Sequence, residues 1–224
     1  MQIKLPKSFF RKGARIRIEP KSIDPGVREP EAPETIVFDI LKKKTIPALI
    51  ESLSDADPYL RSVSAEVLGR LKERKAVSNL IELLSDHSKY VREKAVISLG
   101  HIGDRSSVPS LIKALNDESK EVRVTVAGVL GHLRDRLAVP ALISSLSDPS
   151  AHTRMKAAIS LGIIGDPSAV KALFGLLKDE NEFVRKYACE ALGNIGYPAI
   201  PALLLALKDE KIRAHAAQSL MKIR

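Results

Sequence analysis

Apolar residues along residues 108–138 follow a helical period twice, with a polar break between the two runs. The first run has apolar side chains at 108, 111, 112 and 115, and the second has them at 122, 126, 129, 130 and 133. Spacings of three and four residues place side chains on one face of a helix. The pattern therefore predicts two amphipathic helices joined by a short polar turn.

The same pattern recurs six times along the chain. The Val or Ile that opens each copy returns after 31 residues four times and after 30 residues once. These openings are Ile46, Val77, Val108, Val139, Val170 and Ile200. A fixed period of this length is typical of solenoids, in which each unit buries its apolar face by stacking on its neighbours. We therefore expect an all-α solenoid of about six helix pairs.

Proline and glycine mark the helix ends within each copy. Proline follows the opening residue in four copies and suits the first helical turn, where its missing N–H has no intrahelical partner. An "LG" pair recurs in the second helix, and the lack of a glycine side chain allows close helix approach. Three copies carry another glycine three residues later, but Lys72 and Arg134 replace it in the other two. We expect those two helix ends to be less sharply capped.

Charged residues also recur at fixed positions. An Asp ends the first helix of every copy, and an Arg follows it by six residues in five copies. The pairs are Asp55 and Arg61, Asp86 and Arg92, Asp117 and Arg123, Asp148 and Arg154, and Asp179 and Arg185. One interpretation is an Arg track for an acidic polymer. The regularly placed carboxylates favour the other, a structural ladder in which each Arg bonds the Asp or a carbonyl of an adjoining repeat.

The recurring pattern "VPxLIxxLxDxxxxVRxxAxxxLGxIGD" resembles the HEAT-like repeat of the phycobilin lyase superfamily. The resemblance covers about residues 46–224. It implies a right-handed superhelix of helix pairs, with the second helix of each pair lining the concave side.

Residues 1–33 lie outside the repeat and are strongly basic. The chain has a formal net charge of +9, and residues 1–21 alone contribute +6. Six of the cations of this arm are interleaved with two aromatic residues: Lys4, Lys7, Phe9, Phe10, Arg11, Lys12, Arg15 and Arg17. Prolines follow, so we expect an extended arm that is a solubilising tail, a protein-binding arm or a nucleic-acid-binding arm. We expect residues 34–44 to form a capping helix and residues 45–224 to form the repeat array.

One stripe of the second helices is the candidate binding surface. Where the outer copies have Glu66 and Glu190, the middle three have Ile97, Gly128 and Ile159. An apolar strip with a basic rim is typical of a protein docking site, unless superhelical curvature buries the isoleucines against neighbouring helices. The predicted partner groove comprises Tyr59, Tyr90, Lys94, Ile97, His101, Val124, His132, His152, Met155, Ile159, Phe183 and Tyr187.

The sequence offers no catalytic constellation, and we expect no cofactor. Deoxyhypusine hydroxylase, a HEAT-like family that this repeat also resembles, binds iron through His-Glu pairs, but no His here precedes a Glu. His101 and His132 share a repeat position, yet helices about 8 to 10 Å apart do not by themselves converge on one metal ion, so no metal site is expected. The single cysteine, Cys189, is expected to be buried.

These observations predict a non-enzymatic scaffold or adaptor that binds a protein partner along the groove. The first alternative is a nucleic-acid- or ribosome-associated factor anchored by the arm. A phycobilin lyase is less favoured, because the chain has no Trp and only 4% aromatic residues. No run of about 18 apolar residues suggests a membrane span, and the cytoplasm is the expected location. The last repeat lacks a polar cap, so Ile212, Ala216, Leu220 and Ile223 could face a second copy.

Overall fold

The chain folds into six helix pairs over residues 44–223, the part that the computed structural model describes. The first helices are residues 44–51, α3 (Val77–Glu82), α5 (Val108–Ala114), α7 (Val139–Ser144), α9 (Val170–Leu176) and α11 (Ile200–Ala206). The second helices are α2 (Pro58–Arg70), α4 (Lys89–Ile102), α6 (Lys120–Leu133), α8 (Ala151–Ile164), α10 (Glu182–Ile195) and α12 (Arg213–Lys222). Short 3-10 helices flank them: η2 (Ser52–Ser54), η3 (Arg74–Ala76), η4 (Leu83–Ser85), η5 (Arg105–Ser107), η6 (Arg136–Ala138), η7 (Ser145–Ser147), η8 (Pro167–Ala169) and η9 (Tyr197–Ala199).

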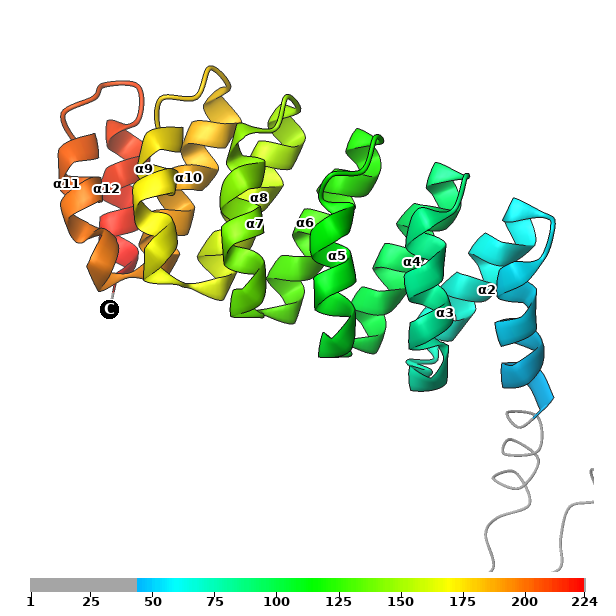
Figure 1. The fold of residues 1–224 in the computed structure, drawn as a ribbon. Helices are drawn as coiled ribbons and strands as arrows, with labels where there is room; N and C mark the ends of the chain where they lie inside the picture. Colours follow the sequence, from blue (N-terminus) through cyan, green and yellow to red (C-terminus); the bar gives the residue numbers. More distant parts are fainter. Residues whose placement is uncertain (1–43, 224) are drawn as a thin grey trace, which may run out of the picture. The chain divides into compact units, whose positions relative to one another are not determined.

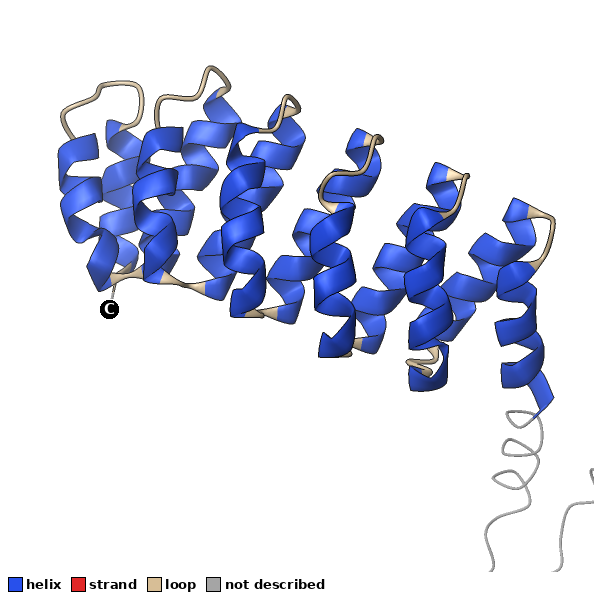
Figure 2. Cartoon of the chain, in the orientation of Figure 1, coloured by secondary structure: helices blue, strands red, loops and turns tan. Residues whose placement is uncertain are grey.

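The predicted all-α solenoid is thereby confirmed. Within the array, the first helices form one layer and the second helices a parallel layer behind it (Figure 1). Each second helix packs against the next, from α2 on α4 through to α10 on α12. The turns within repeats lie along one edge and the turns between repeats along the other (Figure 2). The predicted arm at residues 1–33, and all but residue 44 of the predicted cap, lie outside the described residues.

The hydrophobic core runs the length of the array between the two layers. Its largest fully buried side chains are mostly leucines, contributed by both helical layers: Leu53, Leu68, Leu80, Leu99, Leu111, Leu130, Leu142, Leu161, Leu173, Leu192 and Leu203. Burial of one such side chain stabilises the fold by about 1.5 to 3 kcal/mol. Cys189 on α10 is fully buried as predicted, and burial raises the pKa of its thiol to about 11.

Successive second helices touch at the "LG" glycines. A Cβ built on Gly162 of α8 would lie 2.7 Å from the Cα of Ala191 on α10, closer than real atoms approach. Hydrogen bonds also link successive second helices, since the Ser160 hydroxyl donates to the Ala127 carbonyl at 2.7 Å. The predicted close approach is therefore confirmed.

Two helix ends differ from the sequence prediction. Lys72 and Arg134 adopt the left-handed conformation, with φ of 52° and 51°, as Gly103 and Gly165 do with 73° and 74°. The expectation of less sharply capped ends was wrong, because the chain still turns at both positions as it does at a glycine. The conformation costs a residue with a side chain at least about 1 kcal/mol.

The last repeat also differs from expectation. Ile212 and Ala216 were expected to be available to a second copy, but both are buried at 3% and 0% exposure. Arg213 starts α12 only four residues after Asp209, and this shorter connection turns these side chains inward. The exposed apolar residues here are instead Leu204, Leu205 and Met221.

Candidate functional site

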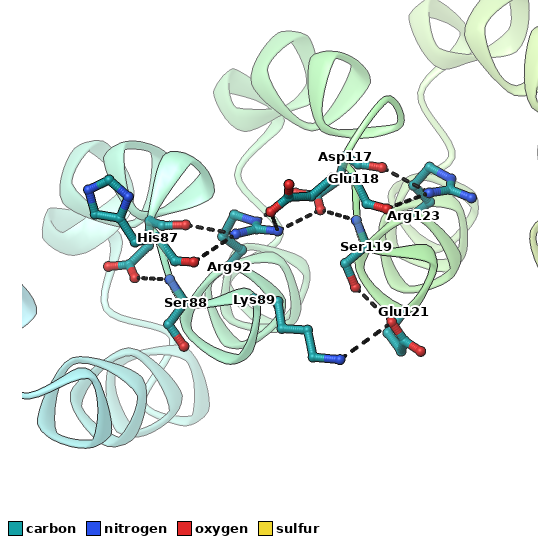
Figure 3. A network of polar contacts seen from close by, with 10 residues as sticks. His87, Ser88, Lys89, Arg92, Asp117, Glu118, Ser119, Glu121 and Arg123 are labelled. Atoms are coloured by element: carbon teal, nitrogen blue, oxygen red, sulfur yellow. Dashed lines mark hydrogen bonds and ion pairs between the residues drawn. The ribbon is translucent and has the colours of Figure 1, made fainter.

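The candidate site is the second-helix face, the surface of α4, α6, α8 and α10 that points away from the first helices. The recurring Asp and Arg residues position one end of this face, because each Arg lies in the first turns of a second helix. Figure 3 shows the arrangement around Arg92, where one guanidinium joins two consecutive repeats.

Four of these arginines share one set of bonds. Arg92 Nε and Nη2 donate to the two carboxylate oxygens of Asp117 in the next repeat, at 2.7 and 2.8 Å. Its Nη1 donates to the carbonyls of Asp86 and His87 in its own repeat, at 2.9 and 3.3 Å. Arg61, Arg123 and Arg154 repeat this pattern on Asp86, Asp148 and Asp179, each with an Nε to Oδ2 distance of 2.7 Å. These four arginines are thus engaged within the array, and the track for an acidic polymer does not fit them.

The environment of the carboxylates follows from these bonds. Burial alone would raise the pKa of Asp148, but hydrogen bonds from Arg123 and from the Ser150 N–H outweigh burial and hold it below its ordinary value. The pKa values of Asp86 and Asp179 are lowered in the same way. Each Asp also fixes the turn before the second helix, as when the Ser88 N–H donates to Asp86 Oδ1 at 2.8 Å.

Arg185 is the exception to the predicted ladder. Its Nη1 donates to the carbonyls of Asp179 and Glu180, but its Nε is buried with no acceptor among the described residues. The turn between repeats five and six is one residue shorter than the others, since Gly196 is followed directly by Tyr197 and lacks the Asp found after Gly165. Arg185 makes no bond to Asp209, which follows it by 24 residues, whereas the other four arginines bond an Asp that follows by 25.

The predicted groove residues lie along the second-helix face with graded exposure. Tyr59, Tyr90 and Phe183 are the most exposed, at 70%, 67% and 56%. The three histidines on the face are also exposed: His101, His132 and His152. The remaining members are half-buried: Lys94, Ile97, Val124, Met155, Ile159 and Tyr187. Ile97 and Ile159 are therefore neither fully solvated nor part of the buried core.

Two adjoining hollows occupy the face near the starts of α6, α8 and α10. The first, of about 340 Å³, is lined by Glu93, Lys120, Glu121, Val124, Thr125, Ser150 and His152. The second, of about 390 Å³, is lined by Ala151, His152, Met155, Asn181, Phe183 and Tyr187. His152 lines both, so the two hollows adjoin at this side chain. The structure thus gathers five predicted residues here, while the other seven groove residues lie outside the hollows.

The walls of both hollows are mainly apolar, and the first is also lined by two carboxylates, Glu93 and Glu121. Glu93 accepts a hydrogen bond from Thr125 Oγ1 at 3.1 Å and forms no ion pair within the described part of the chain. Glu121 accepts from Ser119 Oγ and lies 3.8 Å from Lys89 Nζ (Figure 3). A carboxylate pair beside an apolar pocket can hold a donor group and an apolar side chain at once.

Several lining residues escaped the sequence prediction. Ser150 and Asn181 are the N-cap residues of α8 and α10, and Lys120 and Ala151 begin their helices. The repeat pattern contains the information needed, because the same stripe extended upstream of the Arg reaches these positions. A linear stripe does not show how the helices curve, however, so it does not predict that these residues line a hollow.

Neither a metal-binding cluster nor a membrane-spanning helix is found in the same part of the chain. Across residues 44–223, no three His, Cys, Asp or Glu residues are placed to hold a metal ion together. No described helix combines the length and apolar character needed to cross a membrane.

Known proteins resemble this arrangement. The complex of CpcE and CpcF of phycocyanin lyase from Nostoc sp. PCC7120 matches with a TM-score of 0.62 and 26% identity, covering 90% of this chain and 80% of that one. An engineered protein matches with a TM-score of 0.60 and 22% identity, covering 80% and 96%. A designed armadillo repeat protein in complex with the peptide (KR)4 matches at 0.59 and 20% identity, covering 80% and 99%. No curated protein matches the sequence.

The family model for HEAT repeats matches residues 46–119, 108–184 and 172–224. These ranges together cover every helix pair that the structure describes. The chain belongs to the HEAT-repeat family.

Proposed function

We propose that the protein is a non-enzymatic scaffold that binds an extended segment of a partner protein along the second-helix face. The observation that carries the proposal is the pair of adjoining hollows across α6, α8 and α10. Pockets that combine apolar walls with a few polar groups are typical of peptide recognition. The repeat fold holds these walls rigidly, which lowers the entropy lost on binding.

In this proposal, each hollow binds a different part of the partner segment. Met155, Phe183 and Tyr187 offer a pocket for one apolar side chain of the partner. Glu93 and Thr125 offer hydrogen-bond acceptors to the neighbouring residues of the same segment. Phe183 is 56% exposed, so its burial by a partner would stabilise the complex.

The similar structures support this class of function. One designed armadillo repeat protein was solved in complex with the peptide (KR)4, so a protein of this architecture does bind a peptide. The phycocyanin lyase likeness favours a lyase as the less preferred alternative. Against it, the described face offers Tyr and Phe side chains but no Trp to grip a tetrapyrrole.

The basic arm supports a second role. Six Lys and Arg residues with Phe9 and Phe10 could attach the protein to nucleic acid or to the ribosome. A steep salt dependence that disappears when these six residues are replaced by Gln would support that role. The cytoplasm remains the proposed location.

A peptide selection tests the scaffold. Peptides of about 12 residues displayed at random would be selected on the full-length protein, since an extended chain of that length spans both hollows. We expect enriched peptides with an apolar residue, and at least about tenfold weaker binding to the Phe183→Ser, Tyr187→Ser variant. The readout detects peptide binding and not a bound visible pigment. A protein that acts only as a pigment lyase is therefore not expected to enrich peptides.

The matched control lies on the other layer of the array. Leu204 is 53% exposed on α11, so Leu204→Ser removes a comparable exposed apolar group away from the second-helix face. Binding that is equally weak in both variants, or unchanged in both, would contradict the proposed site.

A further inference from the structure

The edge formed by the turns between repeats carries a cluster of cations that peptide binding does not use. Six exposed residues in the first three turns form this basic edge: Lys72, Arg74, Lys75, Arg105, Arg134 and Arg136. The next two turns, residues 165–168 and 196–199, contain no Lys or Arg. The charge is therefore a local feature of the first half of the array and not a property of the repeat.

The carboxylates on this edge are already occupied by the backbone. Glu73, Asp104 and Asp135 accept hydrogen bonds from N–H groups two residues later, at 3.2, 2.9 and 3.0 Å. These bonds begin η3, η5 and η6, so the acidic residues serve the fold. Arg136 lies 3.7 Å from Asp166, but its side chain is 78% exposed and the pair is weak. Six cations against three carboxylates leave these turns with a charge of +3.

The backbone at two of the cations favours a different residue. Lys72 and Arg134 hold the left-handed conformation, and the other three turns have glycine at this position. Cations near a helix C-terminus complement the helix dipole, which offsets part of the cost of this conformation. Strained positions of this kind cluster at functional sites. Lys72 and Arg134 thus add charge to the edge at positions where glycine would fit without strain.

We propose that the basic edge binds the phosphate backbone of a nucleic acid. Neighbouring turns are about 8 to 10 Å apart, the distance between packed helices. Phosphates along one strand are spaced more closely, so long Lys and Arg side chains from each turn can reach successive phosphates. The first three turns carry no aromatic side chain for base stacking, so binding is independent of sequence. This site lies apart from the hollows of the second-helix face, and both can be occupied together.

The test removes charge while relieving backbone strain. In the full-length protein, Lys72→Gly with Arg134→Gly restores the residue that suits the left-handed turn. A fluorescent single-stranded RNA of about 20 nucleotides would be titrated at about 50 to 300 mM salt. We expect about tenfold weaker binding at the lowest salt and a log–log salt slope shallower by about 1.5, because two phosphate contacts are lost. The melting temperature should stay the same or rise, so weaker binding cannot be ascribed to unfolding.

A charge-matched control separates the basic edge from net charge. Lys178 and Lys208 are exposed on the opposite row of turns, and Lys178→Gln with Lys208→Gln removes the same total charge. We expect less than about a twofold change in RNA affinity for this variant. Equal weakening in both variants, or unchanged binding in the glycine variant, overturns the proposal.

Other anionic partners are tested with the same variants. Polyglutamate and phosphatidylserine vesicles replace the RNA as probes. If either probe binds as tightly as RNA and loses as much affinity in the glycine variant, the edge is a general anionic surface and the nucleic-acid assignment fails. Peptides selected on the second-helix face should bind the glycine variant unchanged, so the two proposals can fail separately.

Discussion

Each paired arginine of the ladder holds two repeats together through one planar group. Arg123 donates to both carboxylate oxygens of Asp148 in the next repeat, at 2.7 and 3.0 Å. It also donates to two carbonyls of its own turn, at 2.9 and 3.1 Å. Bidentate pairs whose remaining donors are also satisfied are the arrangement in which a buried ion pair is tolerated.

Substitution of a ladder arginine separates this pairing from simple packing. Arg123→Leu leaves the Asp148 carboxylate buried without its cation, and we expect the free energy of unfolding to fall by about 3 kcal/mol. Arg185→Leu loses only two bonds to carbonyls, and we expect a loss of about 1 kcal/mol. Urea denaturation of both variants measures the difference. Equal losses would show that the aspartate pairing adds nothing.

The ladder also makes stability depend on pH in a defined direction. The folded pKa values of Asp86, Asp148 and Asp179 lie below their ordinary values. Their contribution is therefore complete above the unfolded pKa of about 4 and is lost as the pH falls through the lower folded values. We expect the melting temperature to drop below about pH 4, and to drop less in Asp148→Asn. A variant that loses as much as the wild type would exclude Asp148 as a contributor.

The six-residue offset between Asp and Arg predicted the ladder but not its register. The sequence left open whether each Arg bonds the Asp or a carbonyl of an adjoining repeat; in the structure the Asp comes from the following repeat, whereas the carbonyls belong to the repeat of the Arg itself. The break at Arg185 was not foreseen. It coincides with one residue fewer between Arg185 and Asp209, and the sequence alone does not show where that difference places the Asp209 side chain.

At the scale of helices, the spacing between α8 and α10 is set by a glycine. A Cβ on Gly162 would clash with the Ala191 backbone, whereas a Cβ on Gly175 of α9 would meet nothing within 4 Å. The same substitution therefore has opposite consequences at the two positions. We expect Gly162→Ala to lower the free energy of unfolding by about 2 kcal/mol and Gly175→Ala to raise it by about 0.5 kcal/mol. Thermal denaturation compares the two, and destabilisation by Gly175→Ala would refute the steric explanation.

The repeat period predicted that the helices exist and in which order they pack, and Pro and Gly predicted the helix ends except at Lys72 and Arg134. The sequence predicted the proposed binding surface only in part. Val124, His152, Met155, Phe183 and Tyr187 line the hollows as the stripe suggested. Ile97 and Ile159 do not, because the walls come from the starts of the helices, and helix curvature is not encoded in a linear stripe.

At the scale of the whole array, each repeat contacts only its neighbours, so stability is expected to be local. Cys189 reports on the fifth repeat, because it is fully buried and burial raises its thiol pKa to about 11. A thiol reagent can modify it only when the surrounding repeats open. The rate of modification in the native state thus measures opening at this end of the array.

Two equivalent substitutions at different distances test this locality. Arg154 bonds Asp179 in the turn between the two helices of the fifth repeat, whereas Arg61 bonds Asp86 three repeats away. We expect Arg154→Leu to speed modification of Cys189 by at least about tenfold, because it loosens the repeat that covers the thiol. Arg61→Leu should change the rate by less than about twofold, although it removes the same kind of ion pair. If both substitutions accelerate modification equally, the array opens as one cooperative unit and its stability is not local.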